Sequence, residues 1–467
     1  MNEELYELPA GWSWVKLGEV GTIVGGGTPR RDNPDFYENG TIPWATPTDI
    51  DQKEILTIFR TAEKITEDAV KGSSARVLPV GTVLFSSRAS IGKIAIAGTE
   101  LATNQGFANI IPSSVLDSKY LAYGLRRFTK DIERLGSGTT YVEVAKSSLK
   151  EFYFPLAPLN EQRHIVAKVE ALLAESKTAR EALNKVPVLL RRFRQSVLAK
   201  AFRGELTQRD PNDEPALKLL EKIKQRTQTK LMEDEDEKPS GLSELPEEWI
   251  WIKLGNLIES MKNGLYKPLR FYGPGVPCLR MYNIEDGKIV WKNVKEMILS
   301  DKETDEYSLQ ENDILLNRVN SRELVGKAAV ISRGIGKVVF ESKNIRIRVR
   351  QEFVDPRYVS YFLLTRYARD QIELECKQTV GMATVSQEDI KSWFIPYTSL
   401  NEQKRVVTRI EETFSLSDQV EATTKKTRER VERIDQAILT KAFKGELTPQ
   451  DPDDEPASIL LQRLKTK

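Results

Sequence analysis

The clearest pattern of hydrophobic positions lies in two long segments, residues 160–202 and 401–443. In the first, the positions that recur at alternating steps of four and three are Ile165, Val169, Leu172, Ser176, Ala179, Leu183, Val186, Leu190, Phe193 and Val197. In the second, the stripe holds Ile410, Val420, Val431, Ile434 and Ile438, diluted by Thr413, Ser417, Thr424 and Thr427. This spacing is typical of the seam of a coiled coil.

A helix that carries one such stripe must bury it against another surface. We expect the two helices to pair antiparallel within one chain, which would relate the two halves by an approximate two-fold axis. The alternative is that each helix packs only on its own domain.

Local signals mark the ends of the first helix. Asn160 is expected to be its N-cap, with Glu161 favourable in the first turn. Gly204 is placed to act as the C-terminal cap. Pro187 lies inside the pattern and is expected to kink or break the helix.

The segments between the long helices have a mixed pattern. Residues 81–85 and 312–316 are predicted to form short strands after turns, and 93–96 and 327–331 the strands that follow. Residues 120–135 and 358–375 have helical spacing, and the Gly-Gly-Gly-Thr-Pro run at 25–29 is predicted to be a loop.

The chain also repeats itself. Leu8-Pro9-Ala10-Gly11-Trp12 returns as Leu245-Pro246-Glu247-Glu248-Trp249, and Leu159-Asn160-Glu161-Gln162 returns as Leu400-Asn401-Glu402-Gln403. Over residues 200–216 and 441–457, 13 of 17 positions are identical. The middles, 19–150 and 256–390, match only in fragments. A period of about 240 residues means two similar domains rather than a solenoid, whose repeats are far shorter.

These patterns predict an α+β protein in which two mixed α/β domains are separated by two long helices that form an antiparallel coiled coil. The predicted boundaries are 1–155 for the first domain, 156–243 for a central helical spacer and linker, 244–396 for the second domain, and 397–467 for a C-terminal helical spacer and tail. Residues 232–241 form the acidic linker between the halves.

Composition narrows the classes of function. The chain holds two cysteines and one histidine, His164, which excludes a disulfide framework and the usual zinc sites. The net charge is only +2, although residues 156–205 alone carry ten basic and five acidic side chains. No window reaches the roughly 18 apolar residues of a membrane span, and the acidic start does not resemble a signal peptide. We therefore expect a cytoplasmic protein without a membrane partner.

No constellation of nucleophiles or metal ligands repeats in the two halves. Asn33-Pro34-Asp35-Phe36 differs from the Asn-Pro-Pro-Phe/Tyr motif of adenine methyltransferases by an Asp at its third position. The Gly-Lys pairs at 92–93 and 326–327 lack the upstream glycine of a phosphate-binding loop. Three hypotheses remain open: a DNA-binding specificity module, an enzyme such as a nuclease, and a two-headed adaptor that binds protein partners.

The repeated motifs, taken in order, resemble those of the specificity subunits of Type I restriction-modification systems. The resemblance rests on Leu-Pro-x-x-Trp opening each half, Leu-Asn-Glu-Gln opening each long helix, and Lys-Ala-Phe-x-Gly-Glu-Leu closing it. It also rests, in the first domain, on residues 26–29, 42–44, 86–93 and 103–107. The resemblance covers essentially the whole chain.

The resemblance implies a non-catalytic subunit with two target-recognition domains, each reading a short half-site of double-stranded DNA. The helical spacer would fix the gap between the half-sites. Two methylation subunits would dock on the helical regions and carry S-adenosylmethionine. A restriction subunit, where present, would carry ATP- and Mg-dependent translocation and cleavage. This chain itself is expected to bind no cofactor and no metal.

Base reading requires side chains that match the edges of base pairs, such as Arg or Lys for guanine and Asn or Gln for adenine. Polar loops supply the candidates, because loops present side chains beyond the scaffold. In the first domain they are Thr28, Arg30, Arg31, Ser86, Arg88, Ser90, Thr139, Thr140 and Tyr141. In the second domain they are Lys262, Lys267, Arg280, Asn283, Asn317, Arg318, Asn320, Arg322, Lys377, Gln378 and Thr379. The alternative is that these are ordinary solvated loops.

The near-identical helix ends are the candidates for partner binding, because two like copies can bind two copies of one partner. The residues are Lys200, Phe202, Gly204, Glu205, Lys441, Phe443, Gly445 and Glu446. Locally we expect each motif to be a capped helix end with its phenylalanine buried.

Overall fold

A computed structural model of the chain describes residues 5–51, 54–88, 90–136, 142–227, 244–379 and 381–466. The chain divides into two compact units. Unit 1 is formed by residues 1–184 and 425–467, and unit 2 by residues 185–424. Each unit therefore combines sequence from both halves of the chain, with the first part of one long helix and the last part of the other.

The globular part of unit 1, from β1 to β10, is called head 1. Its main sheet has five strands in the order β2-β9-β6-β7-β4, and a smaller sheet has the order β5-β3-β8. The strands are β1 Ser13–Lys16, β2 Gly21–Gly25, β3 Ile42–Ala45, β4 Leu56–Ile58, β5 Glu63–Ile65, β6 Val83–Ser86, β7 Ile94–Ala97, β8 Ala102–Thr103, β9 Phe107–Pro112 and β10 Tyr153–Leu156. The helices are α1 Leu17–Val20, α2 Glu67–Lys71, α3 Ser118–Glu133 and α4 Lys146–Lys150.

The globular part of unit 2, from β11 to β24, is called head 2, and its central strands follow the same plan. The main sheet is β12-β21-β17-β19 and the smaller sheet is β16-β13-β20. The strands are β11 Ile250–Lys253, β12 Ile258–Asn263, β13 Tyr272–Leu279, β14 Ile284–Glu285, β15 Lys288–Ile289, β16 Lys295–Met297, β17 Ile314–Asn317, β18 Val319–Asn320, β19 Ala328–Val330, β20 Val339–Phe340, β21 Asn344–Val349, β22 Lys377–Thr379, β23 Met382–Thr384 and β24 Phe394–Tyr397. Its helices are α7 Asp301–Tyr307, α8 Pro356–Leu363, α9 Arg366–Glu375 and α10 Gln387–Ser392.

The predicted strands and the helix near residue 120 are confirmed by β6, β7, β17, β19 and α3. The helical spacing over 358–375 is also confirmed, and the chain forms two helices there, α8 and then α9. The hydroxyl of Thr365 accepts a hydrogen bond from the Ala368 amide (3.1 Å) and so caps a new helix at this point. The loop predicted at 25–29 is confirmed except at Gly25, which ends β2.

The two long helices, α5 (Leu159–Ala201) and α11 (Leu400–Phe443), run antiparallel within each unit. In unit 1, Ser176 and Arg180 of α5 both bind Asp435 of α11, while the start of α5 lies beside the chain that follows α11. In unit 2, Arg194 binds Asp418 (2.7 Å) and Glu421 (3.3 Å). The predicted α+β class, with two heads and a coiled coil, is confirmed. Among the described helices, none is long and apolar enough to cross a membrane.

Part of the predicted seam is wrong. Ala179, Phe193, Val420 and Ile434 are exposed, and the phenylalanine retains 49% of its accessible surface. Charged residues one position further along are the ones that face the partner helix, namely Arg180, Arg194 and Asp435. The apolar stripe therefore drifts off the contact line in the middle of each helix, where ion pairs replace hydrophobic burial.

The helix-end predictions have a mixed outcome. Asn160 is not the N-cap, because α5 begins at Leu159, and its amide instead donates to Asp454 (3.0 Å). Pro187 does not break the helix and lies inside α5. The C-terminal cap is confirmed: Gly204 has φ +72°, and the Glu205 amide donates to the Lys200 carbonyl (2.9 Å).

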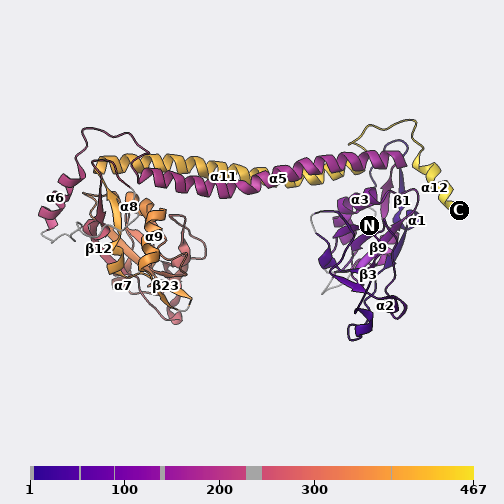
Figure 1. Cartoon of the computed structure of the whole chain (residues 1–467), viewed down its shortest axis with the longest axis horizontal. Coiled ribbons are helices and arrows are strands. Elements are labelled where there is room, and N and C mark those ends of the chain that lie inside the picture. The colour runs from indigo at the N-terminus through magenta and orange to yellow at the C-terminus, as the bar shows by residue number, and fades with distance from the viewer. Residues whose placement is uncertain are drawn as a thin grey trace. The chain divides into compact units, whose positions relative to one another are not determined.

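The end of each long helix is buried in the head encoded by the other half of the sequence. Phe443, from the second half, packs in head 1 with its ring centroid 4.8 Å from Tyr120 and 5.9 Å from Phe154. Phe202, from the first half, packs in head 2 at 4.9 Å from Tyr358 and 5.4 Å from Phe362. Figure 1 shows the yellow end of the chain, including α12 (Ala457–Lys465), against the indigo head, and α6 (Ala216–Thr227) with head 2.

The other repeated motifs meet these helix ends, at two sites that we call joint 1 and joint 2. Joint 1 is formed by Pro9, Trp12, Glu161, Phe443 and Gly445, and joint 2 by Pro246, Trp249, Glu402, Phe202 and Gly204. A Cβ atom at Gly445 would lie 2.2 Å from Cγ of Pro9, and one at Gly204 would lie 2.4 Å from Cγ of Pro246. Both glycines also have φ +72°, so the position requires glycine for two reasons.

The glutamine of each Leu-Asn-Glu-Gln motif ties its helix to the head. Gln162 donates to the carbonyls of Val115 and Ala157, both at 2.9 Å, and accepts from the Asp117 amide at 2.8 Å. Gln403 makes the same three contacts in unit 2, to Phe353, Thr398 and Asp355. These buried amides explain why the motif occurs in both halves.

The two joints differ in charge. In joint 2, Glu402 accepts from the Thr207 hydroxyl (2.6 Å) and pairs with Arg405, which also binds Asp213. In joint 1, His164 occupies the position equivalent to Arg405. Among the described residues, the Thr448 hydroxyl and Oδ2 of Asp454 have no hydrogen-bond partner there. Burial raises the pKa of Glu161, and the hydrogen bond from Trp12 (2.8 Å) opposes this rise.

Phe443→Ala is expected to destabilise head 1 by about 3–5 kcal/mol, the usual cost of emptying a buried aromatic site. Hydrogen exchange of the full chain should show lost protection in β1 and β10, with head 2 unchanged. Phe202→Ala should give the reverse pattern, and Phe193→Ala, at an exposed position on α5, should change neither head. Equal loss of protection in both heads for either variant would contradict this assignment.

Joint 1 is expected to lose stability as the pH rises. Because the pKa of Glu161 is raised in the folded chain, its contribution is present below the ordinary glutamate pKa and declines as the pH rises through the raised value. Glu161→Gln should remove this decline, measured as the free energy of unfolding between pH 4.5 and 8. Glu175→Gln, at an exposed position on the same helix, should retain it. An unchanged pH profile for Glu161→Gln would show that this carboxyl does not titrate differently on folding.

Candidate nucleic-acid interface

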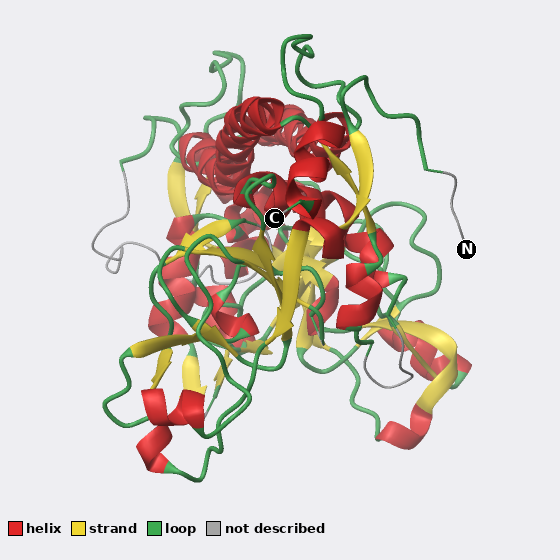
Figure 2. Cartoon of the chain, turned by 90° about the vertical axis from the view of Figure 1, so that its right-hand side faces the viewer, coloured by secondary structure: helices red, strands yellow, loops and turns green. Residues whose placement is uncertain are grey.

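Each head has a helix end and a loop end. In head 1, β9 and β6 are antiparallel neighbours, so the end of β2, the start of β9, the end of β6 and the start of β7 lie at one edge of the sheet. The opposite edge leads through Val115 and Asp117 to α5. Figure 2 shows the strands of the unit nearest the viewer between the long helices and the distal loops.

In head 1 the candidate loops meet at this loop end. The turn 104–106 lies at their centre: Gln105 contacts the Thr28 side chain, and the Gly106 carbonyl accepts from the Ser87 amide (2.9 Å). Arg88 pairs with Glu143 (3.0 Å), and these residues also form a β-bridge. Thr139, Thr140 and Tyr141 lie outside the described residues.

Head 2 repeats this arrangement with other side chains. The turn 341–343 lies at the centre: the Ser342 amide donates to the Leu265 carbonyl (2.9 Å), and the Arg318 amide donates to the Lys343 carbonyl (2.8 Å). Strands β18 and β22 both pair with β23, so residues 319–320 and 377–379 lie on opposite sides of residues 382–384 in one small sheet. In both heads, described candidate loops that lie far apart in the sequence are thus brought to one end of the head.

Four of the predicted contact residues are buried and hold the loops in shape. Ser86 and Asn317 are fully buried, Asn283 retains 1% of its accessible surface and Asn320 retains 8%. Asn317 donates to the carbonyl of Lys343 (3.0 Å) and accepts from Asn320 (2.7 Å). Asn283 donates to the Val290 carbonyl (2.9 Å). Their polar atoms are used within the head, so we assign them a structural role and not a DNA contact.

Most of the predicted cations lie near the surface, paired with carboxylates. The pairs are Arg30 with Asp32, Arg31 with Glu63, Arg88 with Glu143, Lys262 with Glu306, Lys267 with Glu303 and Arg280 with Glu341. Thr28, Ser90, Arg322, Lys377 and Gln378 are exposed, Arg318 is half-buried, and Thr379 lies in β22. Because the carboxylates offset these six cations, the described residues of the two loop ends do not form a strongly positive surface.

The comparisons with known proteins agree with this architecture. Residues 9–187 and 246–432 each match the family described as the Type I restriction modification DNA specificity domain. The chain belongs to this family.

The similar proteins include specificity subunits of Type I restriction enzymes from bacteria and an archaeon. The chain is 25% identical to the specificity subunit of the Type I restriction enzyme EcoKI of Escherichia coli, over 99% of this chain and 96% of the relative. It is 26% identical to the StySPI specificity subunit of Salmonella potsdam over the same shares. It is 27% identical to the MjaIX subunit of Methanocaldococcus jannaschii, over 84% of each.

Solved structures show the same fold. A chain from a study of complex assembly and conformational transition of the type I R-M system aligns with a TM-score of 0.68 at 22% identity, over 95% of this chain and 100% of that one. The HsdS subunit from Thermoanaerobacter tengcongensis aligns with a TM-score of 0.59 at 22% identity, over 96% and 100%.

In this member of the family, the residues predicted for partner binding divide into two groups. Phe202 and Phe443 are fully buried, and the two glycines are pressed against prolines, so these four build the joints. The charged members of the motif are exposed at both joints: Lys200, Glu205, Lys441 and Glu446. Only this second group remains available to a partner.

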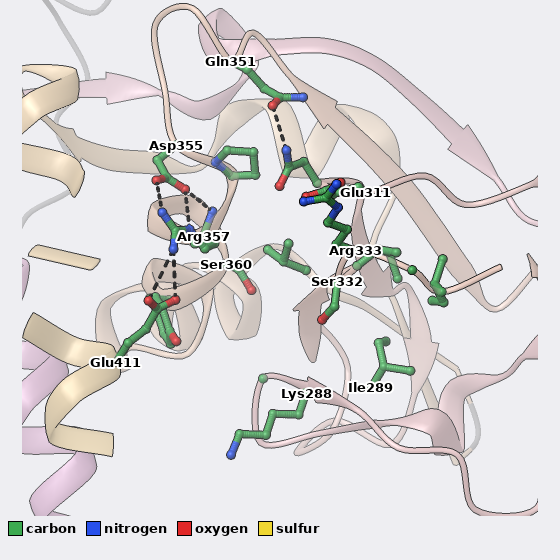
Figure 3. Close-up of a pocket in the computed structure, with 18 of the residues that line it drawn as sticks. Lys288, Ile289, Glu311, Ser332, Arg333, Gln351, Asp355, Arg357, Ser360 and Glu411 are labelled. Carbon is green, nitrogen blue, oxygen red and sulfur yellow. Dashed lines mark hydrogen bonds and ion pairs between the residues drawn. The ribbon is translucent and has the colours of Figure 1, made fainter. Parts of the chain in front are cut away.

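A cavity of about 1110 Å³ lies at the helix end of head 2, on the side away from the loops. Figure 3 shows Arg357 there, bound to Asp355 (2.9 Å) and to Glu411 (3.3 Å) of α11. Lys288 and Arg333 share the cavity with Glu311. Such balanced charge does not favour a polyanion, so we do not place DNA in this cavity.

Sequence reasoning named Arg280 and Asn283 as candidates but did not predict the 3-10 turn after β13 that holds them, and it missed the equivalent turn after β3 altogether. The Thr46 amide donates to Oδ2 of Asp49 (2.8 Å), and the Arg280 amide donates to Oδ1 of Asn283 (2.9 Å). Both turns lie at the loop end. The signal that could have found them is the step from a buried strand to Thr-Pro-Thr in one head and Arg-Met-Tyr in the other.

Asn317→Ala is expected to lower the stability of head 2 by about 1–3 kcal/mol, because it leaves buried partners without hydrogen bonds. Gln378→Ala, at an exposed position of the same loop end, should leave stability unchanged. Chemical denaturation of the full chain measures both. Unchanged stability of Asn317→Ala together with lost DNA binding would instead indicate a direct DNA contact.

Proposed function

We propose that this chain is the sequence-specific DNA-binding subunit of a Type I restriction-modification enzyme. Each head reads one half-site of a bipartite double-stranded target, and the paired helices set the gap between the half-sites. The chain has no catalytic role and binds no cofactor. Because its ligand is DNA, we expect a cytoplasmic location.

One observation supports this proposal above the others. The two heads share one frame of strands, and their described loops gather at the same end of that frame. The side chains there differ, with Thr28, Arg31 and Arg88 in one head and Lys267, Arg280 and Arg322 in the other. A shared frame that carries two different sets of base-reading side chains is what a bipartite target requires.

Partners complete the proposed complex. We expect two methylation subunits that carry S-adenosylmethionine to dock on the two joints through the exposed charged residues of the repeated motif. Restriction subunits would supply ATP- and Mg-dependent cleavage. Since the loop-end cations are largely paired with carboxylates, the isolated chain should bind DNA weakly and gain affinity when partners add phosphate contacts.

The adaptor hypothesis shares the frame and differs only in the ligand of the loop ends. The carboxylates that pair with the loop-end cations are the observation in its favour, because they reduce the attraction to phosphate. An adaptor would bind a protein at these surfaces and would leave the pattern of DNA methylation unchanged.

The test is to co-express the chain with the methylation subunit encoded beside it and to map methylated adenines in the host DNA. The expected result is one split motif with a fixed gap. A host that expresses the methylation subunit alone is the control and should lack that motif. A soluble complex that adds no methylation would refute the proposal and favour the adaptor.

A further inference from the structure

The 3-10 turn after the third strand of each head stands at an equivalent place in both. In head 1 the turn Pro47–Asp49 follows β3, which pairs in parallel with β8. In head 2 the turn Met281–Asn283 follows β13, which pairs in parallel with β20. The strand before each 3-10 turn is hydrogen-bonded to the turn 104–106 in head 1 and to the turn 341–343 in head 2. The Asn104 amide donates to the Ala45 carbonyl (3.0 Å), and the Glu341 amide donates to the Leu279 carbonyl (3.0 Å).

Each turn touches the loops that carry the candidate contacts. In head 1, Nζ of Lys93 donates to the Pro47 carbonyl (2.6 Å), which connects the turn to the loop after β6. In head 2, Nε of Arg280 and the amide of Met281 both donate to the Glu341 carboxylate, which connects the turn to the loop between β20 and β21. Each turn therefore contacts a neighbouring loop at the loop end of its head.

The frame of the turn is shared but its outward side chains are not. Thr46 and Thr48 in head 1 correspond to Arg280 and Tyr282 in head 2. In head 1 the two hydroxyls lie 2.6 Å apart, and the hydroxyl of Thr46 donates to Asp49 (2.8 Å). A pair of small hydroxyl side chains thus stands where the other head carries a guanidinium and an aromatic ring.

The guanidinium of Arg280 is held in a defined orientation. Its Nε donates to Oε2 of Glu341 (3.1 Å), and Oε1 of the same carboxylate accepts from the Met281 amide (3.3 Å). The guanidinium carbon lies 5.5 Å from the ring centroid of Tyr282, which is 60% exposed. A contact through Nε leaves the two terminal amino groups of the fork for another acceptor. A planar, oriented fork is the group that binds O6 and N7 of guanine.

We propose that this turn is a specificity-determining element of both heads, in which Arg280 contacts a guanine of the half-site read by head 2, and Thr46 with Thr48 contacts the corresponding position for head 1. Glu341 is a positioning residue that aims the guanidinium. The inference rests on the proposed function, because it names residues that would carry its base specificity.

The test is the methylation map of the full complex with Arg280→Ala. We expect one G·C position of one half-site to lose its preference by about tenfold or more, the range for losing a good bidentate contact. The other half-site and the gap should stay unchanged. Arg333→Ala, an exposed arginine at the helix end of the same head, is the matched control and should leave the whole motif intact.

Arg280→Lys is a second variant, which tests the inference even if Arg280→Ala does not fold. Lysine keeps the positive charge beside Glu341 but lacks the planar guanidinium, so the same G·C position of the half-site should lose its base preference. An unchanged motif with Arg280→Lys, a wild-type half-site without a G·C pair for head 2, or relaxation in both half-sites would overturn the inference. Absence of any split motif in the wild-type complex would instead be a failure of the proposed function.

Discussion

The structure depends on an exchange of helix ends between the two halves of the sequence. Phe443 completes the core of head 1 and Phe202 completes the core of head 2, each among aromatic rings from the opposite half. Neither head can close its core with its own half alone. The constraint explains the distribution of repeated residues: those that recur in both halves build the joints, and the residues between them are free to differ.

The two long helices also carry opposite charges at equivalent positions of the repeat. Arg180 and Arg194 on α5 correspond by the repeat to Glu421 and Asp435 on α11. At each of these positions the cation is on α5 and the carboxylate is on α11, and the structure pairs them within each unit. Two copies of α5 in the same register would bring arginine against arginine. The ion pairs thus favour the pairing of unlike helices, which a purely apolar seam would not distinguish.

The polar residues of the loop ends have two different roles, one inside the head and one at its surface. Asn283 and Asn317 are fixed inside by hydrogen bonds to backbone carbonyls, while Arg280 and Arg88 reach the surface beside a carboxylate. Asparagine and serine both build tight loops and match base edges, so their presence in a loop does not separate the two roles. Only burial separates them, and burial depends on how three distant loops pack.

The sequence by itself determined the family, the duplication and the two mixed heads, because repeats and hydrophobic periods are properties of the chain read in order. It predicted the antiparallel pairing of the long helices as one of two arrangements, and the structure decided between them. The sequence also marked Gly204 correctly as a cap, since that conformation is local. The tertiary structure alone decided that Arg180 replaces Ala179 at the helix contact and that the turn at Arg280 contacts Glu341 in a distant loop. These outcomes depend on contacts between residues far apart in the chain, and no local pattern encodes such contacts.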